Sequence, residues 1–362
     1  LKAHEQACRQ HLEPRNAARR VLIVSVVLLI VVAVFAYGLV IFDSESLVLL
    51  NHVFLIITVI VLQLFLLRAA SYIYHTQYST TVFLWPALPI GFGAILLAQM
   101  VSLRTAVWSG AFWSVVAGFQ MDLSFQVFLT GCIASFVGST AVYRARSRLQ
   151  MFRAGFWIGV TIMVVNSLYF IGSEVPPRLL LICGGIALTN GVGTAVLASF
   201  VMPALEYCFG TTTDTSLLEL SDLNHPLMRR LQMEAPGTFH HSIIVATLAE
   251  QATSAIGANP LLARVCAYFH DIGKLSQPAY FTENMKASGE SPHDNLQPRM
   301  SSLIILNHVK DGLEMARAYR LKRAICNAIA THHGTDLVGY FYHRAREQEQ
   351  QSRKEGKGDK EY

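Results

Sequence analysis

Long apolar stretches dominate the chain between residues 21 and 209. A helix needs roughly twenty apolar residues to cross a bilayer. Stretches of this kind run over Val21–Phe42, Leu47–Leu67, Val82–Leu103, Leu123–Val142, Phe152–Ile171 and Leu179–Tyr207. Thr105–Phe119 is also apolar but shorter, so it is either a seventh span or a segment that enters the membrane and returns. The pattern therefore predicts a transmembrane bundle of six or seven helices.

In residues 210–362 the apolar positions recur at helical spacing and are separated by polar and charged residues. Leu217–Leu231 is predicted to be an amphipathic helix beside the membrane, interrupted by a turn at His225. Further helices are expected after Ala235 and over Leu261–Phe269, Ser301–His308 and Leu321–Thr331. No segment alternates with period two, as a strand does. The predicted fold class is all-α, with a multi-span transmembrane helical bundle followed by a cytoplasmic all-helical domain.

These patterns divide the chain into five regions. Residues 1–20 are the end of a longer N-terminal region, 21–209 form the membrane bundle, and 210–234 form a helical linker beside the membrane. Residues 235–345 form the cytoplasmic domain, and 346–362 form a charged tail. Because the chain starts with Leu1 and ends in a polar run, we expect both ends to be cut from a longer protein.

Basic residues mark the loops that are expected on the cytoplasmic side of the membrane. One loop region is rich in them, with Arg144, Arg146, Arg148 and Arg153. The last span then delivers residue 210 and those after it to the cytoplasm. The orientation of the first residues stays open at this point. Six spans would put Arg15, Arg19 and Arg20 inside the cell, and seven would put them outside.

Composition excludes several function classes. Apolar residues make up 52% of the chain and charged residues 15%, with a mean hydropathy of +0.39, which is too apolar for a soluble protein. The net charge of +5 is not gathered into a basic stripe with aromatic residues, so we expect no duplex nucleic acid as a partner. No Asp, Glu or Lys lies deep in a span, which argues against an ion pump. The scattered cysteines are interpreted as small apolar residues. The lipid bilayer is the expected partner of the apolar half.

Histidines gather in the polar half, near the predicted helix ends. They are the doublet His240-His241, the pair His270-Asp271, His308, and the doublet His332-His333. Imidazoles that converge on a carboxylate suit a site with two metal ions, bridged by Asp271, that stabilises the oxygens of a phosphoryl group during hydrolysis. Lys274 suits a phosphate contact as a point charge. The residues alone do not decide whether His240 or His241 is a ligand.

Several longer motifs resemble those of the bacterial seven-transmembrane HD phosphohydrolases. They are Glu219–Leu227, Ala235–Ser242, Leu261–Lys274, Ser291–Asp294 and His332–Thr335. The resemblance implies an extracellular domain, a membrane bundle, and a cytoplasmic HD domain, here residues 235–345, that hydrolyses cyclic di-AMP. It also implies seven spans, with the residues before Val21 outside the cell. The implied location is the bacterial cell (inner) membrane, crossed several times, with the HD domain in the cytoplasm.

Carried over position by position, the resemblance implies how the histidines divide. His241, His270 and Asp271 would hold one metal, and Asp271 would bridge to a second metal held by His308, His332 and His333. The implied catalytic residues are Asp271 and Lys274, and the implied substrate-facing residues are Lys274 and His240. His293 also matches a family position, but a loop residue beside proline is equally expected to be structural.

One departure from the family concerns the first metal. The family closes that site with an aspartate on a later helix. Asp336 lies too close to His333 to match it, and Asp359 lies in the charged tail. We therefore expect this chain to lack one carboxylate ligand and to turn over substrate poorly.

The function predicted from the resemblance is that of a membrane-anchored phosphodiesterase that converts cyclic di-AMP to the linear dinucleotide pApA. Two divalent transition-metal ions are the expected cofactors. Iron or manganese suits histidine-rich, carboxylate-bridged ligands better than magnesium does. The cyclic dinucleotide is an expected partner, and a homodimer is a further one to consider. Two alternatives stay open: an HD phosphohydrolase for another nucleotide, and a non-catalytic membrane receptor that binds metal or nucleotide.

Overall fold

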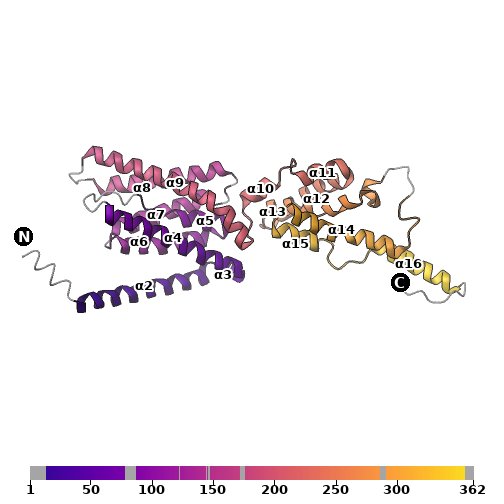
Figure 1. The fold of residues 1–362 in the computed structure, drawn as a ribbon, viewed down its shortest axis with the longest axis horizontal. Helices are drawn as coiled ribbons and strands as arrows, with labels where there is room; N and C mark the ends of the chain where they lie inside the picture. Colours follow the sequence, from indigo (N-terminus) through magenta and orange to yellow (C-terminus); the bar gives the residue numbers. More distant parts are fainter. Residues whose placement is uncertain are drawn as a thin grey trace, which may run out of the picture. The chain divides into compact units, whose positions relative to one another are not determined.

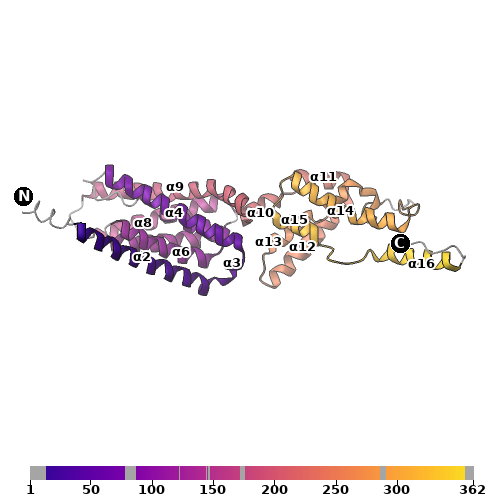
Figure 2. The same ribbon diagram turned by 60° about the horizontal axis from the view of Figure 1, so that its bottom comes forward.

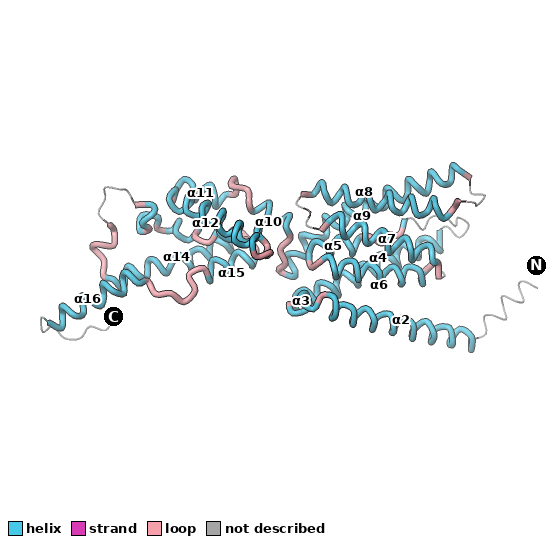
Figure 3. The backbone as a smooth tube through the Cα atoms, turned by 180° about the vertical axis from the view of Figure 1, so that it is seen from behind, coloured by secondary structure: helices cyan, strands magenta, loops and turns pink. Residues whose placement is uncertain are grey.

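A computed structural model describes residues 14–354, apart from 78–86, 122, 144, 146, 172–175 and 286–290. The regular structure of these residues is entirely helical (Figure 3), which confirms the all-α prediction. The chain divides into two compact units between Thr211 and Thr212. Most of the predicted region 1–20, Arg144 and Arg146, and the end of the predicted tail lie outside the described residues.

The first unit consists of helices whose positions follow the apolar stretches (Figure 1). They are α2 (Pro14–Phe42), α3 (Ser44–Val48), α4 (Leu50–Gln77), α5 (Phe92–Met100), α6 (Leu103–Gln120), α7 (Phe125–Val142), α8 (Arg148–Tyr169) and α9 (Pro177–Phe209). Among the described residues, α2, α4, α7, α8 and α9 are long and apolar enough to cross a membrane. Thr105–Phe119 lies within α6, a continuous helix of 18 residues. The predicted span Val82–Leu103 lies partly outside the described residues, and its described part contains α5.

Side-chain hydrogen bonds gather several helix ends at one end of this unit. Asp43, just after α2, accepts a hydrogen bond from Thr105 Oγ1, near the start of α6, at 2.6 Å. Gln99 in α5 donates to the carbonyl of Val142 at the end of α7. Asn51, near the start of α4, donates to the last carbonyl of α9 at 3.1 Å. The described helices α2 and α4 to α9 therefore run alternately toward and away from this end (Figure 2).

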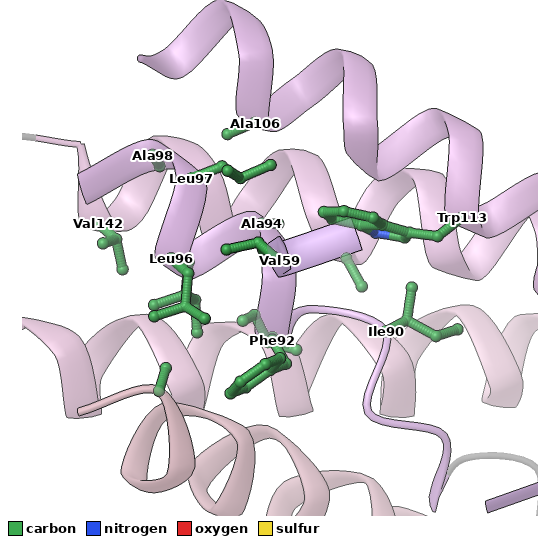
Figure 4. Close-up of a cluster of buried hydrophobic side chains, with 14 of the residues drawn as sticks. Val59, Ile90, Phe92, Ala94, Leu96, Leu97, Ala98, Ala106, Trp113 and Val142 are labelled. Atoms are coloured by element: carbon green, nitrogen blue, oxygen red, sulfur yellow. The ribbon is translucent and has the colours of Figure 1, made fainter. Parts of the chain in front are cut away.

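The short helix α5 lies in the core of the first unit. Eight of its nine residues are buried, and Figure 4 shows Phe92 among the same buried side chains as Trp113 of α6. The backbone just before α5 is not helical, and Gln63 of α4 satisfies it. Gln63 Nε2 donates to the carbonyl of Pro89 at 3.0 Å, and Gln63 Oε1 accepts from the backbone N–H of Gly93 at 2.7 Å. Inside a bilayer, non-helical backbone needs such internal partners.

The second unit is built from shorter helices. They are α10 (Asp214–Leu220), α11 (Pro226–Glu234), α12 (Pro236–Ala255), α13 (Pro260–Phe269), the 3-10 turns η2 (Ile272–Ser276), η3 (Pro278–Tyr280) and η4 (Thr282–Asn284), then α14 (Pro298–Ala318), α15 (Arg323–Thr331) and α16 (Gly339–Lys354). Helices α11 to α14 begin with proline, which suits a first turn because it needs no hydrogen bond there. The fully buried apolar side chains of the second unit include Val265, Phe269, Ile272, Ile325 and Ile329.

The helix predicted over Leu217–Leu231 is two helices, α10 and α11. His225 separates them, because its Nδ1 accepts a hydrogen bond from the backbone N–H of Leu227 at 3.3 Å and so caps α11. His225 is thus a turn and capping residue.

The prediction that a helix ends at His308 is wrong, because α14 continues to Ala318. Gly312 follows the predicted helix end by four residues, but it is not among the described glycines with positive φ. A side-chain carbon at Gly312 would lie 3.3 Å from the backbone nitrogen of Gly273 and 3.0 Å from Ile329. Gly312 therefore serves close packing of α14 against η2 and α15, and His308 lies in the middle of its helix.

Candidate metal centre

Asp271 lies at the junction between α13 and η2. Helix α13 ends at Phe269, and η2 begins at Ile272. Both of these side chains are fully buried in the core. The two residues between them, His270 and Asp271, are therefore fixed from both sides, and only 2% of Asp271 is exposed.

Histidines surround Asp271 in two groups. The His241 group contains His241, His270 and Asp271, and the His308 group contains Asp271, His308, His332 and His333. Asp271 Oδ2 lies 3.1 Å from His270 Nε2 and 4.0 Å from His241 Nε2. Asp271 Oδ1 lies 3.5 Å from the Nε2 atoms of both His308 and His332. The two carboxylate oxygens therefore face different groups, as those of a bridging ligand do.

Three of these histidines are oriented by their own helices. Nδ1 of His270 lies 2.7 Å from the carbonyl oxygen of Ala267, and Nδ1 of His332 lies 2.9 Å from that of Ile329. Nδ1 of His308 makes the same contact with the carbonyl three residues earlier. An Nδ1–H that donates to a carbonyl leaves the lone pair of the neutral ring on Nε2, which points at the cluster. The helices thus fix both the tautomer and the direction of these rings.

The spacing of the nitrogens suits a metal ion. Nε2 of His308 lies 3.3 Å from Nε2 of His332 and 3.2 Å from Nε2 of His333. Two nitrogens that are each about 2.1 Å from one ion lie about 3.0 Å apart at a right angle and about 3.4 Å apart at the tetrahedral angle. In addition, Asp271 Oδ1 is buried and accepts no hydrogen bond within the described part of the chain. A cation would satisfy that oxygen.

Burial and close contacts set the charges of the cluster. Burial alone would raise the pKa of Asp271, but contacts with His270 and His332 and nearby positive charge outweigh it and hold that pKa well below its usual range. The pKa values of His308 and His333 are lowered, chiefly by burial. Burial also acts against the charged form of His270, but its hydrogen bond to Asp271 and the charge of Asp271 raise its pKa. Near neutral pH, Asp271 is therefore ionised, and His308 and His333 are in the neutral form that binds metal.

Lys274, the predicted phosphate-binding residue, lies between two carboxylates. Its Nζ is 2.8 Å from Asp271 Oδ2 and 2.7 Å from Glu283 Oε1, and its side chain is 13% exposed. Burial alone would lower the pKa of Lys274, but the two carboxylates raise it, so the ammonium stays charged. Glu283 could not be identified from the sequence, because a glutamate in a polar segment of short turns belongs to no motif or periodic pattern that would single it out.

Other predicted residues lie outside both groups. His240 is exposed on α12. His293 is buried, its Nε2 lies 2.8 Å from the carbonyl oxygen of Tyr280, and its ring centroid lies 5.0 Å from that of Phe341, which is a structural role. Asp336 is exposed and belongs to neither group, and Asp359 lies outside the described residues. Among the residues that the structure describes, Asp271 is the only carboxylate in these groups.

A cavity of about 250 Å³ opens beside the cluster. It is lined by His308 and by both apolar and polar side chains, among them Phe281, Gln277, Asn307 and Asp311. Concave sites with a few convergent polar groups are where small ligands usually bind. A buried carboxylate between two sets of imidazoles, next to such a cavity, can hold divalent ions close to a bound molecule.

Comparisons with known proteins cover both units. The model of the family described as a 7TM receptor with intracellular HD hydrolase matches residues 18–213, and that of the HD domain matches residues 238–356. Cyclic-di-AMP phosphodiesterase PgpH of Bacillus subtilis (strain 168) is 32% identical over 337 residues, which make up 88% of this chain and 46% of the relative. The protein of the same name from Listeria monocytogenes serotype 1/2a (strain 10403S) is 36% identical over 300 residues, which make up 80% and 40%.

A solved structure is also similar to part of the chain. It is the HD domain of L. monocytogenes phosphodiesterase PgpH in complex with cyclic-di-AMP, with 48% sequence identity and a TM-score of 0.34. The match covers 35% of this chain and 59% of that chain. The chain spans less than half the length of the two PgpH relatives.

Proposed function

The chain belongs to the family of 7TM receptors with an intracellular HD hydrolase domain, and we propose that it is a membrane-anchored phosphodiesterase that hydrolyses cyclic di-AMP to linear pApA. Membership of the family confirms the resemblance that the motifs predicted. The observation that carries the proposal is the carboxylate of Asp271, which two groups of histidines share. The names of the two bacterial relatives favour cyclic di-AMP as the substrate.

Both groups fit divalent transition metals, and we assign one ion to each. His241, His270 and Asp271 would hold one ion, and Asp271, His308, His332 and His333 the other. Two such ions supply an activated water and a positive clamp on the attacking and leaving oxygens of a phosphoryl group. Imidazole-rich sites with few carboxylates favour iron or manganese over magnesium, which prefers oxygen ligands.

The chain's own residues have separate tasks in this proposal. The Nδ1 contacts of His270, His308 and His332 with backbone carbonyls keep their Nε2 atoms free for coordination. Lys274, charged and partly accessible, offers its ammonium to a phosphate oxygen of the substrate. The exposed side chain of His240 is assigned to the substrate side of the site.

The orientation in the membrane follows from charge. Helices α7 and α9 finish at the same end of the first unit, and basic residues at 144–153 follow α7 directly in the sequence. Cytoplasmic loops carry an excess of such residues. We therefore propose that this end faces the cytoplasm, that the HD domain follows it there, and that the residues before α2 lie outside the cell. Alternation of α2 and α4 to α9 supports seven crossings.

The test is hydrolysis by the full-length protein, purified in detergent and supplied with Mn²⁺ or Fe²⁺. We expect conversion of cyclic di-AMP to pApA that is faster than conversion of cyclic di-GMP or of linear nucleotides, and about two metal equivalents per chain. Asp271→Asn should lower activity by about a hundredfold or more, since loss of groups that support a metal site already costs about 10- to 100-fold. Asp336→Asn is the matched control, because Asp336 is exposed and outside both groups.

The outcomes separate the competing functions. Preference for another nucleotide would assign the protein to a different HD hydrolase activity. Tight binding of metal and cyclic di-AMP without turnover would make it a receptor. Unchanged turnover in Asp271→Asn would refute the catalytic role of the cluster.

A further inference from the structure

Lys274 makes a contact that metal binding would have to change. Its Nζ lies 2.8 Å from Asp271 Oδ2, and Oδ2 is the oxygen that faces His241 and His270. The ammonium therefore occupies the carboxylate oxygen that the ion of the His241 group would use. The other oxygen, Oδ1, has no such cation within the described part of the chain. The two proposed metal positions thus differ in one respect: the ammonium of Lys274 contacts the Asp271 oxygen of the His241 group, and no lysine among the described residues contacts the Asp271 oxygen of the His308 group.

A second carboxylate is in place to receive the ammonium. Glu283 Oε1 lies 2.7 Å from Lys274 Nζ, so the lysine already contacts both acids. Nζ also lies 5.1 Å above the ring of Phe281, where a cation is attracted to the aromatic face. A small movement of Nζ away from Asp271 would keep both the Glu283 and the Phe281 contacts.

Glu283 is held by hydrogen bonds and backbone packing that do not involve Lys274. Thr238 Oγ1 donates to Glu283 Oε1 at 3.1 Å. The neighbouring Asn284 accepts from the backbone N–H of Thr238 at 3.0 Å and donates to its hydroxyl at 2.8 Å. A side-chain carbon at Gly237 would lie 2.5 Å from the carbonyl carbon of Glu283, so the backbones of η4 and α12 are in direct contact. These bonds hold Glu283 in position independently of Lys274.

The hydrogen bonds between Thr238 and the turn at Glu283 and Asn284 also position the helix that carries His241. Thr238 lies three residues before His241 on α12. Residues three apart lie on the same side of a helix. The turn at Glu283 and Asn284 therefore fixes the first turn of the helix that carries His241, as well as the partner of Lys274.

We propose that Lys274 is the resident counter-ion of Asp271 Oδ2 when the His241 group holds no ion, and that Glu283 is the positioning residue that takes over Lys274 when the group is loaded. The inference rests on the proposed metal site. It assigns Glu283 and Thr238 a role in metal loading that is separate from contact with the substrate. The metal affinity of the His241 group then depends on whether the ammonium of Lys274 pairs with Asp271 or with Glu283.

The test measures Mn²⁺ binding to the full-length protein by calorimetry, with the spin–spin coupling between two ions followed by electron paramagnetic resonance. Lys274→Met should tighten binding to the His241 group, because it removes the competing cation. Glu283→Gln should weaken it by roughly tenfold, the scale seen when groups behind metal ligands are lost. In the double variant the effect of Glu283→Gln should disappear, because no ammonium remains to be received. Binding to the His308 group should change little in all three.

Two further variants guard against loss of folding or a simple effect of charge. Thr238→Val removes the hydroxyl that anchors Glu283 without changing any charge, so it should weaken binding alone and have no effect beside Lys274→Met. Glu250→Gln is the matched control. Glu250 forms an ion pair with Arg264, with 3.1 Å between Nη1 and Oε1, and neither residue belongs to the His241 group or the His308 group. It should leave both affinities unchanged.

The possible results are distinct. If Glu283→Gln weakens binding equally with and without Lys274, the effect is one of charge through space, and the exchange of partners is refuted. If two ions bind and neither Lys274→Met nor Thr238→Val changes an affinity, this inference fails and the proposed function stands. If the unaltered protein binds no Mn²⁺ or Fe²⁺ in either group, the proposed function itself fails.

Discussion

Gly273 of η2 approaches the backbone of α14 closely in the candidate metal centre. A side-chain carbon at Gly273 would lie 2.5 Å from the backbone nitrogen of Gly312 and closer still to the carbonyl oxygen of His308. Favourable contacts between such atoms begin at about 3.5 Å. Gly273→Ala therefore has to separate η2 from α14 by at least about 1 Å, the difference between 3.5 Å and the 2.5 Å contact with Gly312, and by more to relieve the contact with His308. Because the obstructing atoms are backbone, no side-chain rotation can relieve the clash.

That separation acts on the metal position as well as on stability. Asp271 Oδ1 lies 3.5 Å from His308 Nε2, and a further 1 Å or more would bring the pair to about 4.5 Å or beyond. Two ligand atoms that are each up to about 2.2 Å from one ion can lie at most about 4.4 Å apart. Gly273→Ala should thus remove the His308 group as a site that includes Asp271. Overpacking of this kind also costs about 1–3 kcal/mol in stability.

The assay combines metal content with thermal unfolding of the full-length protein. Gly273→Ala should lose at least one of two bound Mn²⁺ ions and lower the unfolding temperature of the second unit, by roughly 2–4 °C for each kcal/mol lost. Gly339→Ala is the control, because Gly339 has no atom within 4 Å of an added side-chain carbon. If Gly273→Ala binds both ions with unaltered affinity and melts as the parent does, the close approach of η2 to α14 is not what positions Asp271.

Three further outcomes follow from the same contacts. Gln63→Leu should destabilise the membrane unit by about 1–3 kcal/mol for each backbone group left without its partner, measured by unfolding in detergent. Thr58→Val should be nearly neutral, because the Thr58 hydroxyl donates within its own helix, to the carbonyl of Phe54; equal effects of the two changes would contradict the role of Gln63. Because the pKa values of His308 and His333 are lowered, these rings stay neutral to below the ordinary value of about 6.5, so Mn²⁺ should leave their group only when acidification passes below that pH. Release already complete above pH 6.5 would contradict this. In a Mn²⁺ titration the His308 group should fill first, since Lys274 competes only at the other group, and simultaneous filling would contradict it.

The fold class could be predicted from the sequence because its evidence is local. Apolar stretches of spanning length and helical spacing depend only on neighbouring residues, and they marked α2, α4 and α7 to α9 correctly. The role of Gly312 depends on its environment. A glycine that ends a helix and one that admits a neighbouring backbone are the same letter, and only φ and the contact with Gly273 distinguish them.

Within the candidate site, the histidines were visible to sequence reasoning and their supports were not. The pair His270-Asp271 stands out because two potential ligands are adjacent. The hydrogen bonds of Glu283 and Thr238 join residues 45 apart, and neither residue type is unusual in a polar segment. The hydrogen bonds of Gln63 to Pro89 and Gly93 could not be predicted for the same reason, because they join residues 26 and 30 positions apart. Contacts of this range follow from packing and leave no local pattern.

The two oxygens of the buried Asp271 carboxylate have different surroundings, and this difference favours a bound cation. Asp271 is 2% exposed, and a buried carboxylate is costly unless it is paired. Lys274 compensates Oδ2. Near Oδ1 stand the Nε2 atoms of His308 and His332, whose Nδ1 atoms already face carbonyl oxygens. In its neutral form the His308 ring presents a lone pair to Oδ1, and a lone pair cannot satisfy an anion. Asp271 Oδ1 therefore lacks a hydrogen-bond donor within the described residues, and in the proposed site a divalent ion held by the His308 group would supply positive charge there.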